Sequence, residues 1–412
     1  MFQESQRVLA APRTPVRGPL PLLGPAFVTA IAYVDPGNFA TNLSAGSVYG
    51  YLLVWVVVAS NLMAMLIQYL SAKAGIATGR SLPALCRRHL PLPVVRGLWL
   101  QAELVAIATD LAEVVGGAIA LDLLFGTPLV VGGAITAAVA FGMLALRSRG
   151  HRPFEAAITG MLAVILAGFV YNVVVGAPSA SGVAAGLQPR FDGAGSVLLA
   201  AGMLGATVMP HAIYLHSGLT TDRYVATTDR QRRGLLRSQR VDVVTAMTIA
   251  GAMNLALLVI AATTLGGTGA DTIEAAHDQL GRLEGHGTAV LFALSLLASG
   301  FAASSVGTLS GQVVMEGFLR RRVPLVVRRL SSLAPALAIL AVGTDPTRAL
   351  IASQVVLSFG IPFALVPLIM FTCRADVMGA LVNRRATTAV AVAVAAVIIG
   401  LNVALVTLTV TR

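Results

Sequence analysis

Charged residues are scarce in this chain, and their scarcity decides its class. Only 11% of the 412 residues are Asp, Glu, Lys or Arg, whereas 56% are hydrophobic. A water-soluble fold of this length could not bury so much apolar surface. No stretch of the sequence is long and polar enough to form a second, soluble domain. The composition therefore excludes a soluble protein and indicates one that is embedded in a lipid bilayer.

Cysteine is equally rare, and several motifs of soluble enzymes are missing. The two cysteines, Cys86 and Cys373, stand far apart, so no disulfide framework is expected. No Cys or His cluster has the spacing of a zinc or copper site. Neither His-Glu-x-x-His nor Gly-x-Ser-x-Gly occurs. Residues 1–20 lack the apolar core and the small-residue cleavage site of a secretory signal, so we interpret them as an N-terminal arm.

Long apolar runs are what the chain does have. A run of about 18 or more such residues can cross a bilayer as a helix. Eleven runs recur along the whole length: 21–50, 51–72, 97–124, 127–146, 154–176, 194–218, 241–266, 287–317, 325–343, 347–372 and 386–410. The sequence therefore predicts an all-α integral membrane protein with 11 transmembrane helices.

Basic residues are sorted between the connections that join these runs. The formal net charge of +11 would, by itself, suggest a nucleic-acid partner. If the N-terminus lies in the cytoplasm, however, 25 of the 29 Lys and Arg residues fall in cytoplasmic connections. Such sorting follows the positive-inside rule. The basic excess is therefore a topology signal that places the N-terminus in the cytoplasm and the C-terminus outside, and no nucleic-acid binding is expected.

The first apolar run is interrupted by Asp35-Pro36-Gly37-Asn38. Proline removes a backbone donor and glycine disfavours a helix, so we expect two half-helices, at about 22–34 and 39–50. Open backbone inside a membrane is tolerated only where it lines a protein cavity or an ion site. An ionisable residue at such a place costs roughly 2.5–3.5 kcal/mol on insertion scales, which favours a functional role for Asp35.

The sixth run, residues 194–218, repeats this pattern. Several small residues lead into Met209-Pro210-His211. A second broken helix five segments after the first is typical of an inverted repeat of 5 + 5 helices, which holds its substrate at the midplane between the two breaks. We therefore predict a first repeat at 21–176, an inverted second repeat at 194–372 and an additional helix at 386–410.

The third run carries three acidic residues, Glu103, Asp110 and Glu113. At about 100° per residue, Glu103 and Asp110 lie roughly 20° apart around a helix, with Glu113 about 60° further round. A side chain that reaches the membrane surface could explain Glu103, but it does not easily explain the other two. We interpret this acidic stripe as a proton relay that faces a wet interior.

The side chains at the two breaks suit a metal cation. Asp35 and Asn38 offer oxygen ligands with one carboxylate. Met209 adds a thioether, a soft ligand that is useful to a first-row transition metal but not to Mg²⁺ or Ca²⁺. The implied ion is Mn²⁺ or Fe²⁺. His211 is the residue here whose unperturbed pKa lies near physiological pH, so it is a ligand, a proton carrier or a structural hydrogen-bonding group, with proton handling favoured.

Together, Asp35-Pro36-Gly37-Asn38 and Met209-Pro210-His211 resemble the motifs of the Nramp family of divalent-metal transporters, in its bacterial manganese branch. The similarity covers all eleven runs. It implies the LeuT-type 5 + 5 inverted-repeat fold, with helices 1 and 6 unwound at mid-membrane. It also implies import of Mn²⁺ or Fe²⁺ together with protons across the bacterial inner (cell) membrane, without a resident cofactor.

The resemblance further implies roles for individual residues. The metal ligands would be Asp35, Asn38 and Met209, the backbone carbonyls of Ala32 and Ala206 and, in an occluded state, Gln354. The proton pathway would comprise Asp35, Asp110, Glu113, Glu103 and His211, with Arg328 and Arg329 as its cytoplasmic partners. Polar positions near the pathway would be Asn61, Thr109 and Asn254.

Other functions are compatible with part of this pattern. A sodium-coupled carrier of small solutes could share the fold, but it would need no methionine ligand, and Asp35 would repel a carboxylate substrate. An intramembrane aspartyl hydrolase could use Asp35 and Asp110, although neither stands in a glycine-flanked catalytic motif. A passive channel differs from both in being unable to transport uphill. The ranking of Mn²⁺ against Fe²⁺, Co²⁺ and Cd²⁺, the proton-to-metal ratio and the oligomeric state stay open.

Overall fold

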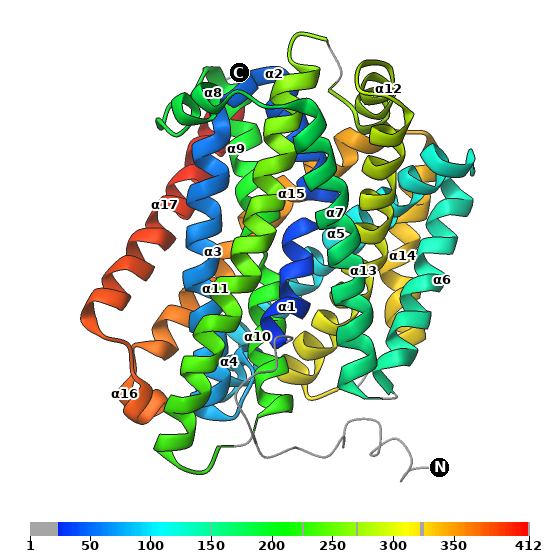
Figure 1. Cartoon of the computed structure of the whole chain (residues 1–412). Coiled ribbons are helices and arrows are strands. Elements are labelled where there is room, and N and C mark those ends of the chain that lie inside the picture. The colour runs from blue at the N-terminus through cyan, green and yellow to red at the C-terminus, as the bar shows by residue number, and fades with distance from the viewer. Residues whose placement is uncertain (1–23, 149, 225, 269–270, 322–324, 411–412) are drawn as a thin grey trace.

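The computed structural model describes residues 24–148, 150–224, 226–268, 271–321 and 325–410. The predicted N-terminal arm, residues 1–20, lies outside these described residues. Within them, every regular element is a helix, and the long helices stand side by side in a bundle (Figure 1). The prediction of an all-α fold is therefore confirmed.

The long elements follow the predicted runs in chain order. They are α1 (Pro25–Ala30), η1 (Ile31–Val34) and α2 (Pro36–Tyr49), which share the first run, then α3 (Val54–Thr78), α5 (Leu92–Phe125), α6 (Leu129–Ser148), α7 (His151–Gly176), α9 (Gly193–Thr207) with α10 (Pro210–Arg223), α11 (Asp229–Ile260) with the π-helical η3 (Ala261–Leu265), α13 (His286–Leu319), α14 (Leu325–Val342), α15 (Pro346–Thr372) and α17 (Arg385–Val410). Short elements join them: η2 (Gly50–Leu53), α4 (Leu82–His89), α8 (Ala180–Gly186), α12 (Ile273–Leu283), α16 (Ala375–Met378) and η4 (Gly379–Leu381).

Nine helical stretches in the described part of the chain are each long and apolar enough to cross a membrane. One of these, Pro36–Thr78, contains α2 and all of α3 and so belongs to two runs. Two shorter apolar helices account for the rest. Pro25–Val34 completes the first predicted run, and Leu333–Val342 lies in the ninth predicted run, 325–343. With these additions the described helices account for the eleven predicted spans.

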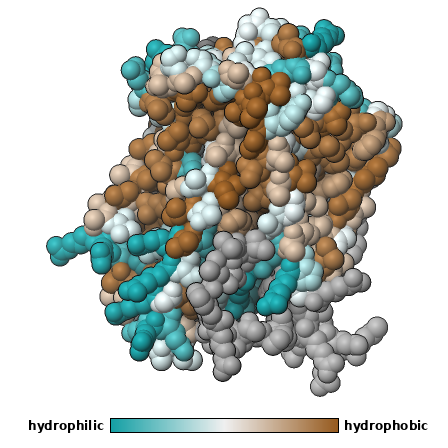
Figure 2. All heavy atoms as spheres, viewed as in Figure 1, coloured by the Kyte–Doolittle hydropathy of each residue, from teal (hydrophilic) through white to brown (hydrophobic). Residues whose placement is uncertain are grey.

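The surface of the bundle separates into a belt and two ends. Figure 2 shows hydrophobic residues over the middle of the molecule and hydrophilic residues gathered at its ends. One end carries α4, α16 and the arginine-rich start of α11, and we call it the basic end (Figure 1). The positive-inside rule predicts that this end faces the cytoplasm.

Small residues let α5 approach its neighbours closely at the centre of the bundle. A Cβ atom on Gly116 would lie 2.0 Å from the Cβ of Pro36, at the start of α2. A Cβ atom on Gly300 of α13 would lie 2.9 Å from the backbone of Gly117. Glycine at these positions permits close packing of the backbones, which is how membrane helices commonly associate. This packing holds α5 against the first break.

Candidate metal centre

The first break is shorter than the sequence predicts. We expected the second half-helix to begin near Phe39, but α2 begins at Pro36, and Asp35 is the one extended residue between η1 and α2. Proline is well tolerated in the first turn of a helix, where its missing N–H has no partner to lose. Asp35 is the N-cap, and its Oδ1 accepts hydrogen bonds from the backbone N–H (2.9 Å) and from Nδ2 (2.7 Å) of Asn38.

The second break has the same design. Helix α9 ends at Thr207, Val208 and Met209 are non-helical, and α10 begins at Pro210 with Met209 as its N-cap. The last carbonyl groups of a helix have no intrahelical donor. One of them, the carbonyl oxygen of Ala206, accepts a hydrogen bond of 2.9 Å from Nδ2 of Asn38. The two breaks therefore meet, although 168 positions separate these residues in the sequence.

A third wall of the site comes from α15. Nε2 of Gln354 lies 3.5 Å from Oδ2 of Asp35. The backbone of α15 is equally near the second break, because a Cβ atom on Gly205 would lie 2.1 Å from the carbonyl oxygen of Gln354. A Cβ atom on Gly37 would lie 1.8 Å from Nε2 of Gln354. Glycine is thus required on both broken helices for α15 to come this close.

The candidate ligands are fully buried. Asp35, Asn38, Ala206, Met209 and Gln354 each have 0% of their surface exposed, and Ala32 in η1 has 1%. Within the described residues, Oδ1 of Asn38 and Oε1 of Gln354 have no hydrogen-bond partner. Buried polar atoms are nearly always hydrogen-bonded, so an unpartnered pair beside a carboxylate indicates a site for a cation. The described residues contain no group of three His, Cys, Asp or Glu side chains that could hold a metal, so any such site must use amide, carbonyl or sulfur ligands.

The predicted proton pathway adjoins this site through α5. Oγ1 of Thr109 lies 3.2 Å from Nδ1 of His211 on α10, and Asp110, the next residue, is 5% exposed. Nε2 of His211 is a further buried atom that lacks a hydrogen-bond partner among the described residues. Glu113 lies one turn further along α5 and faces α13, since a Cβ atom on Gly307 would lie 2.7 Å from its carboxylate.

The remaining predicted pathway residues are less closely connected to the breaks. Glu103 is half-buried on α5, two turns before Asp110. Arg328 and Arg329 lie near the start of α14, and their side chains lie outside the described residues. Asn61 packs against Gly251 of α11 and makes no contact with the candidate ligands that the described part of the structure records.

Asn254 supports the first break rather than lining the pathway directly. Its Nδ2 donates a hydrogen bond of 2.7 Å to the carbonyl oxygen of Tyr33, and its Oδ1 accepts one of 3.1 Å from Asn42. On the other side, Oγ of Ser299 donates to the carbonyl oxygen of Val34 at 2.5 Å. The carbonyls that η1 leaves without helical donors are thus held from α11 and α13.

Sequence reasoning did not assign Asn42 or Ser299 to the site, and it also missed a buried hydrogen-bonded chain beneath α1. Tyr33, Gln68 and His216 are linked by hydrogen bonds of 2.5 and 2.7 Å. The chain continues through Gln239 to Asp242, whose carboxylate accepts from the backbone of Ala26. Apart from lone polar residues in apolar runs, the sequence gives no signal that these groups meet.

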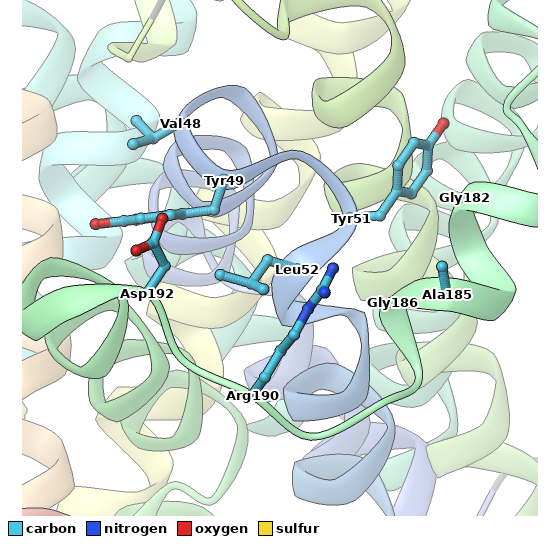
Figure 3. A pocket seen from close by; sticks show the side chains of 9 residues that line it. All are labelled: Val48, Tyr49, Tyr51, Leu52, Gly182, Ala185, Gly186, Arg190 and Asp192. Carbon is cyan, nitrogen blue, oxygen red and sulfur yellow. The ribbon is translucent and has the colours of Figure 1, made fainter.

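A cavity of ≈ 390 Å³ (Figure 3) lies elsewhere, beside α8 at the end of the bundle opposite the basic end (Figure 1). It is lined by Val48, Tyr49, Tyr51, Leu52, Gly182, Ala185, Gly186, Arg190 and Asp192. Val48 follows Asp35 by thirteen residues of mostly helical chain, which corresponds to about 20 Å at 1.5 Å per residue. Figure 3 shows the Arg190 side chain reaching across this space. Because its guanidinium group is positively charged, the cavity is a poorer candidate for a metal site than the breaks are.

Comparison with known proteins decides the family. The family profile described as "Natural resistance-associated macrophage protein-like", Nramp, matches residues 26–408. The chain belongs to the Nramp family. It is 52% identical over 393 residues to the divalent metal cation transporter MntH of Bacillus subtilis (95% of this chain, 92% of the relative). It is 54% identical over 403 residues to MntH of Mycobacterium tuberculosis strain H37Rv (97% and 94%).

Solved structures confirm the fold of this Nramp chain. It superposes on a manganese transporter of Eremococcus coleocola with a TM-score of 0.85 at 30% identity, covering 96% of this chain and 89% of the other. Mhp1, a nucleobase-cation-symport-1 family transporter, matches with a TM-score of 0.62 at 16% identity and shares the fold alone. The LeuT-type prediction is therefore confirmed. Since Nramp proteins are membrane transporters, the aspartyl hydrolase alternative is wrong.

Proposed function

We propose that the protein is a proton-coupled importer of divalent transition metals, Mn²⁺ and also Fe²⁺, that works by alternating access in the bacterial cell membrane. Its relatives in Bacillus subtilis and Mycobacterium tuberculosis are divalent metal cation transporters, and the similar Eremococcus coleocola structure is a manganese transporter. These names support the substrate class. The choice of metal, the coupled proton and the direction of transport are our inference from the site.

The observation that carries the proposal is the placement of the Asn38 amide. Its NH₂ group lies between Oδ1 of Asp35 and the carbonyl oxygen of Ala206, and donates to both. Because both oxygen atoms already face one positively polarised NH₂ group, a cation in its place could bind both of them. On arrival of the metal, the amide would turn and present its unpartnered Oδ1. Asp35, Asn38, Met209, Gln354 and the two alanine carbonyls would then form a mixed oxygen and sulfur site.

Proton coupling follows from the charge of the arriving ion. A divalent cation beside Asp35 favours its ionised form, so a proton held there would leave. Thr109 and His211 connect α5 with α10 beside the site, and Asp110 follows Thr109 directly. The proton would pass to Asp110, one turn from Glu113, and then along α5 past Glu103 toward Arg328 and Arg329 at the basic end.

Alternating access requires the broken helices to move while the binding residues stay together. The spans that contain the breaks, together with α3 and α11, would rock against the rest of the bundle. Because the ion carries two charges, an inside-negative potential would favour its entry by about twice the 2.3 kcal/mol per charge per 100 mV.

The direct test is metal uptake into proteoliposomes with imposed pH gradients and voltages. The parent protein should accumulate Mn²⁺ against its gradient when the outside is acidic, and Asp35→Asn should abolish that uptake. Asp122→Asn, at the far end of α5, is the control and should retain it. Undiminished uptake by Asp35→Asn would refute the site. Uptake driven by a sodium gradient and unaffected by pH would favour the sodium-coupled alternative, and failure to transport uphill would favour a channel.

A further inference from the structure

A second cavity, of ≈ 350 Å³, opens at the basic end. We call it the basic pocket, and it is lined by Arg80, Ala84, Arg87, Arg88, Glu316, Gly317 and Arg320. Arg80 lies in the connection between α3 and α4, three residues come from α4, and the others come from the last turn of α13 and its C-cap, Arg320. Four arginines and one carboxylate leave an excess of positive charge within a small volume. The transport proposal uses none of these residues.

Within the described residues, three of the four arginines of the basic pocket lack the acidic partner that other arginines at the basic end have. Elsewhere at the basic end, arginines pair with acids: Arg223 with Glu155, Arg232 with Asp229 at 3.3 Å and Arg374 with Asp376 at 2.5 Å. In the described part of the chain, Arg80, Arg88 and Arg320 form no ion pair. Like charges that converge on one cavity repel each other, and a bound anion removes that repulsion.

Arg87 has a structural role that sets it apart. Its Nη1 donates a hydrogen bond of 2.8 Å to the carbonyl oxygen of Phe318, in the last turn of α13. Basic side chains at this position satisfy carbonyl groups that the helix leaves without donors. The ligand-binding role therefore falls to Arg80, Arg88 and Arg320, all three of which are exposed at the pocket.

The backbone of Arg320 gives an independent reason to assign it a role. Arg320 is the C-cap of α13 and has a φ of 54°, in the left-handed region. Glycine suits this position best, because it has no Cβ to clash with the backbone. A residue held in an unfavourable conformation is a recognised pointer to function. Here that conformation places a guanidinium beside the arginines of α4.

The position of the basic pocket relative to the bilayer indicates the kind of anion that it binds. Helix α5 begins at Leu92, three residues after α4 ends at His89, and Leu92 and Val94 are 45% and 47% exposed. Exposed apolar residues at the start of a spanning helix mark the level at which it enters the bilayer. We infer that the basic pocket binds a phosphoryl group, supplied by the headgroup of an anionic phospholipid. Guanidinium groups bind phosphate oxygens through paired hydrogen bonds, and basic pockets between membrane helices suit such headgroups.

Occupancy of the pocket would act on elements that move in transport. The backbone N–H of Leu82, at the start of α4, donates to Oγ of Ser217 on α10 at 2.9 Å. A phosphoryl group shared by Arg88 of α4 and Arg320 of α13 would hold α4 against α13, while α4 remains bonded to α10. The bound headgroup therefore stabilises the arrangement seen in this structure.

The test is thermal unfolding of the intact, metal-free protein in a neutral detergent. Phosphatidylglycerol should raise the unfolding midpoint by a few degrees in a saturable manner, as expected for a ligand that binds only the folded state. Phosphatidylcholine should not. Arg80→Gln combined with Arg320→Gly should weaken the response at least tenfold. Arg230→Gln combined with Arg233→Gln, on the exposed start of α11, is the matched control and should respond like the parent.

Two further measurements complete the test. Soluble phosphate compounds identify the source of the phosphoryl group, and a single variant shows whether a lost response is due to misfolding. If inorganic phosphate or glycerol 3-phosphate gives a saturable shift that the pocket variant loses, the phosphoryl site stands and a soluble ligand supplies it. Arg320→Gly alone suits the left-handed backbone, so it should fold at least as well as the parent while losing much of the response. The inference is wrong if both pocket variants respond like the parent, or if phosphatidylcholine acts as strongly as phosphatidylglycerol. Because no metal is present, failure of the transport proposal would leave these results unchanged.

Discussion

Met209 differs in chemistry from every other candidate ligand, and at the residue scale it is the group that would set metal selectivity. It is fully buried and caps α10 at the second break. Thioether sulfur is a soft donor that contributes little to binding of Mg²⁺ or Ca²⁺, whereas first-row transition metals accept it. Without the sulfur, the remaining ligands are oxygen atoms, which hard cations also prefer. Selectivity against the abundant hard ions would therefore depend on one atom.

Replacing this side chain tests that dependence. We expect Met209→Ala to lower the rate of Mn²⁺ uptake by about tenfold and to let Ca²⁺ or Mg²⁺ compete, because the site becomes an all-oxygen one. The measurement is competition between Mn²⁺ and Ca²⁺ in proteoliposomes. Met203→Ala, another buried methionine on α9, should keep the parent's selectivity. A Met209→Ala protein that excludes Ca²⁺ as well as the parent does would remove the role of sulfur.

At this scale the sequence identifies candidate residues by their type, but it does not predict contacts between distant segments. Asp35, Asn38 and Met209 were predictable because a carboxylate, an amide and a thioether are conspicuous beside prolines in apolar runs. Ser299 was not, because serine is common in membrane helices and its partner, the carbonyl oxygen of Val34, is 265 positions away. A hydrogen bond of that kind leaves no local spacing in the sequence.

At the scale of elements, the two breaks are better described as paired helix starts than as unwound stretches. In both, a residue with extended backbone is the N-cap and proline is the first helical residue: Asp35 with Pro36, and Met209 with Pro210. The sequence predicted the interruptions because proline and glycine disfavour a continuing helix. It misplaced the start of α2 because proline also favours a new helix at its first position. Both effects of proline are local and act on the same residue.

Close packing of α15 on α2 is a consequence of one glycine. A Cβ atom at Gly37 would lie 1.8 Å from Nε2 and 2.2 Å from Cδ of Gln354. We expect Gly37→Ala to push this side chain away from Asp35 and to raise the KM for Mn²⁺ about tenfold or more, since a displacement of about 1 Å at a site can cost up to about a hundredfold. Gly97→Ala, on α5 with no atom within 4 Å of the added Cβ, is the control and should leave the KM unchanged.

Measuring both the KM and the thermal stability of Gly37→Ala separates displacement of the Gln354 side chain from a general distortion of the backbone. Alanine has the better helix propensity, so Gly37→Ala should not lower the thermal unfolding midpoint unless the clash spreads into the backbone. An unchanged KM would mean that Gln354 can move aside without affecting the metal. In that case the side chain of Gln354 would not belong to the ligand set.

At the scale of the whole molecule, the eleven spans were predictable because two independent signals agree. Apolar length marks each span, and the distribution of arginine fixes the parity of the count. The long polar start of α11, from Asp229, was not included in the predicted run at 241–266, because apolar length cannot detect a helix that continues beyond the membrane. Which helices touch was also beyond sequence reasoning, since contacts such as Gly117 with Gly300 depend on the arrangement of the complete bundle.

One ion pair at the basic end joins two parts of the bundle that alternating access would separate. Arg223, at the end of α10, pairs with Glu155 near the start of α7, and their side chains are 20% and 11% exposed. Loss of one partner from a largely buried pair is unfavourable because the other charge is left poorly compensated. We expect Glu155→Gln to weaken the contact between α10 and α7 and to raise the population in which these two helices are apart at this end. Hydrogen exchange of the α1 and α10 amides, measured by mass spectrometry, should then become severalfold faster.

Two further variants distinguish this conformational role from general destabilisation. Glu155→Arg combined with Arg223→Glu restores the pair in reverse and should return exchange in α1 and α10 toward the parent's rate. Asp376→Asn removes the partner of Arg374, but those two residues are neighbours on one short segment and join no separate helices. That variant should leave exchange in α1 and α10 unchanged. If Glu155→Gln also exchanges at the parent's rate, the pair does not hold α10 to α7.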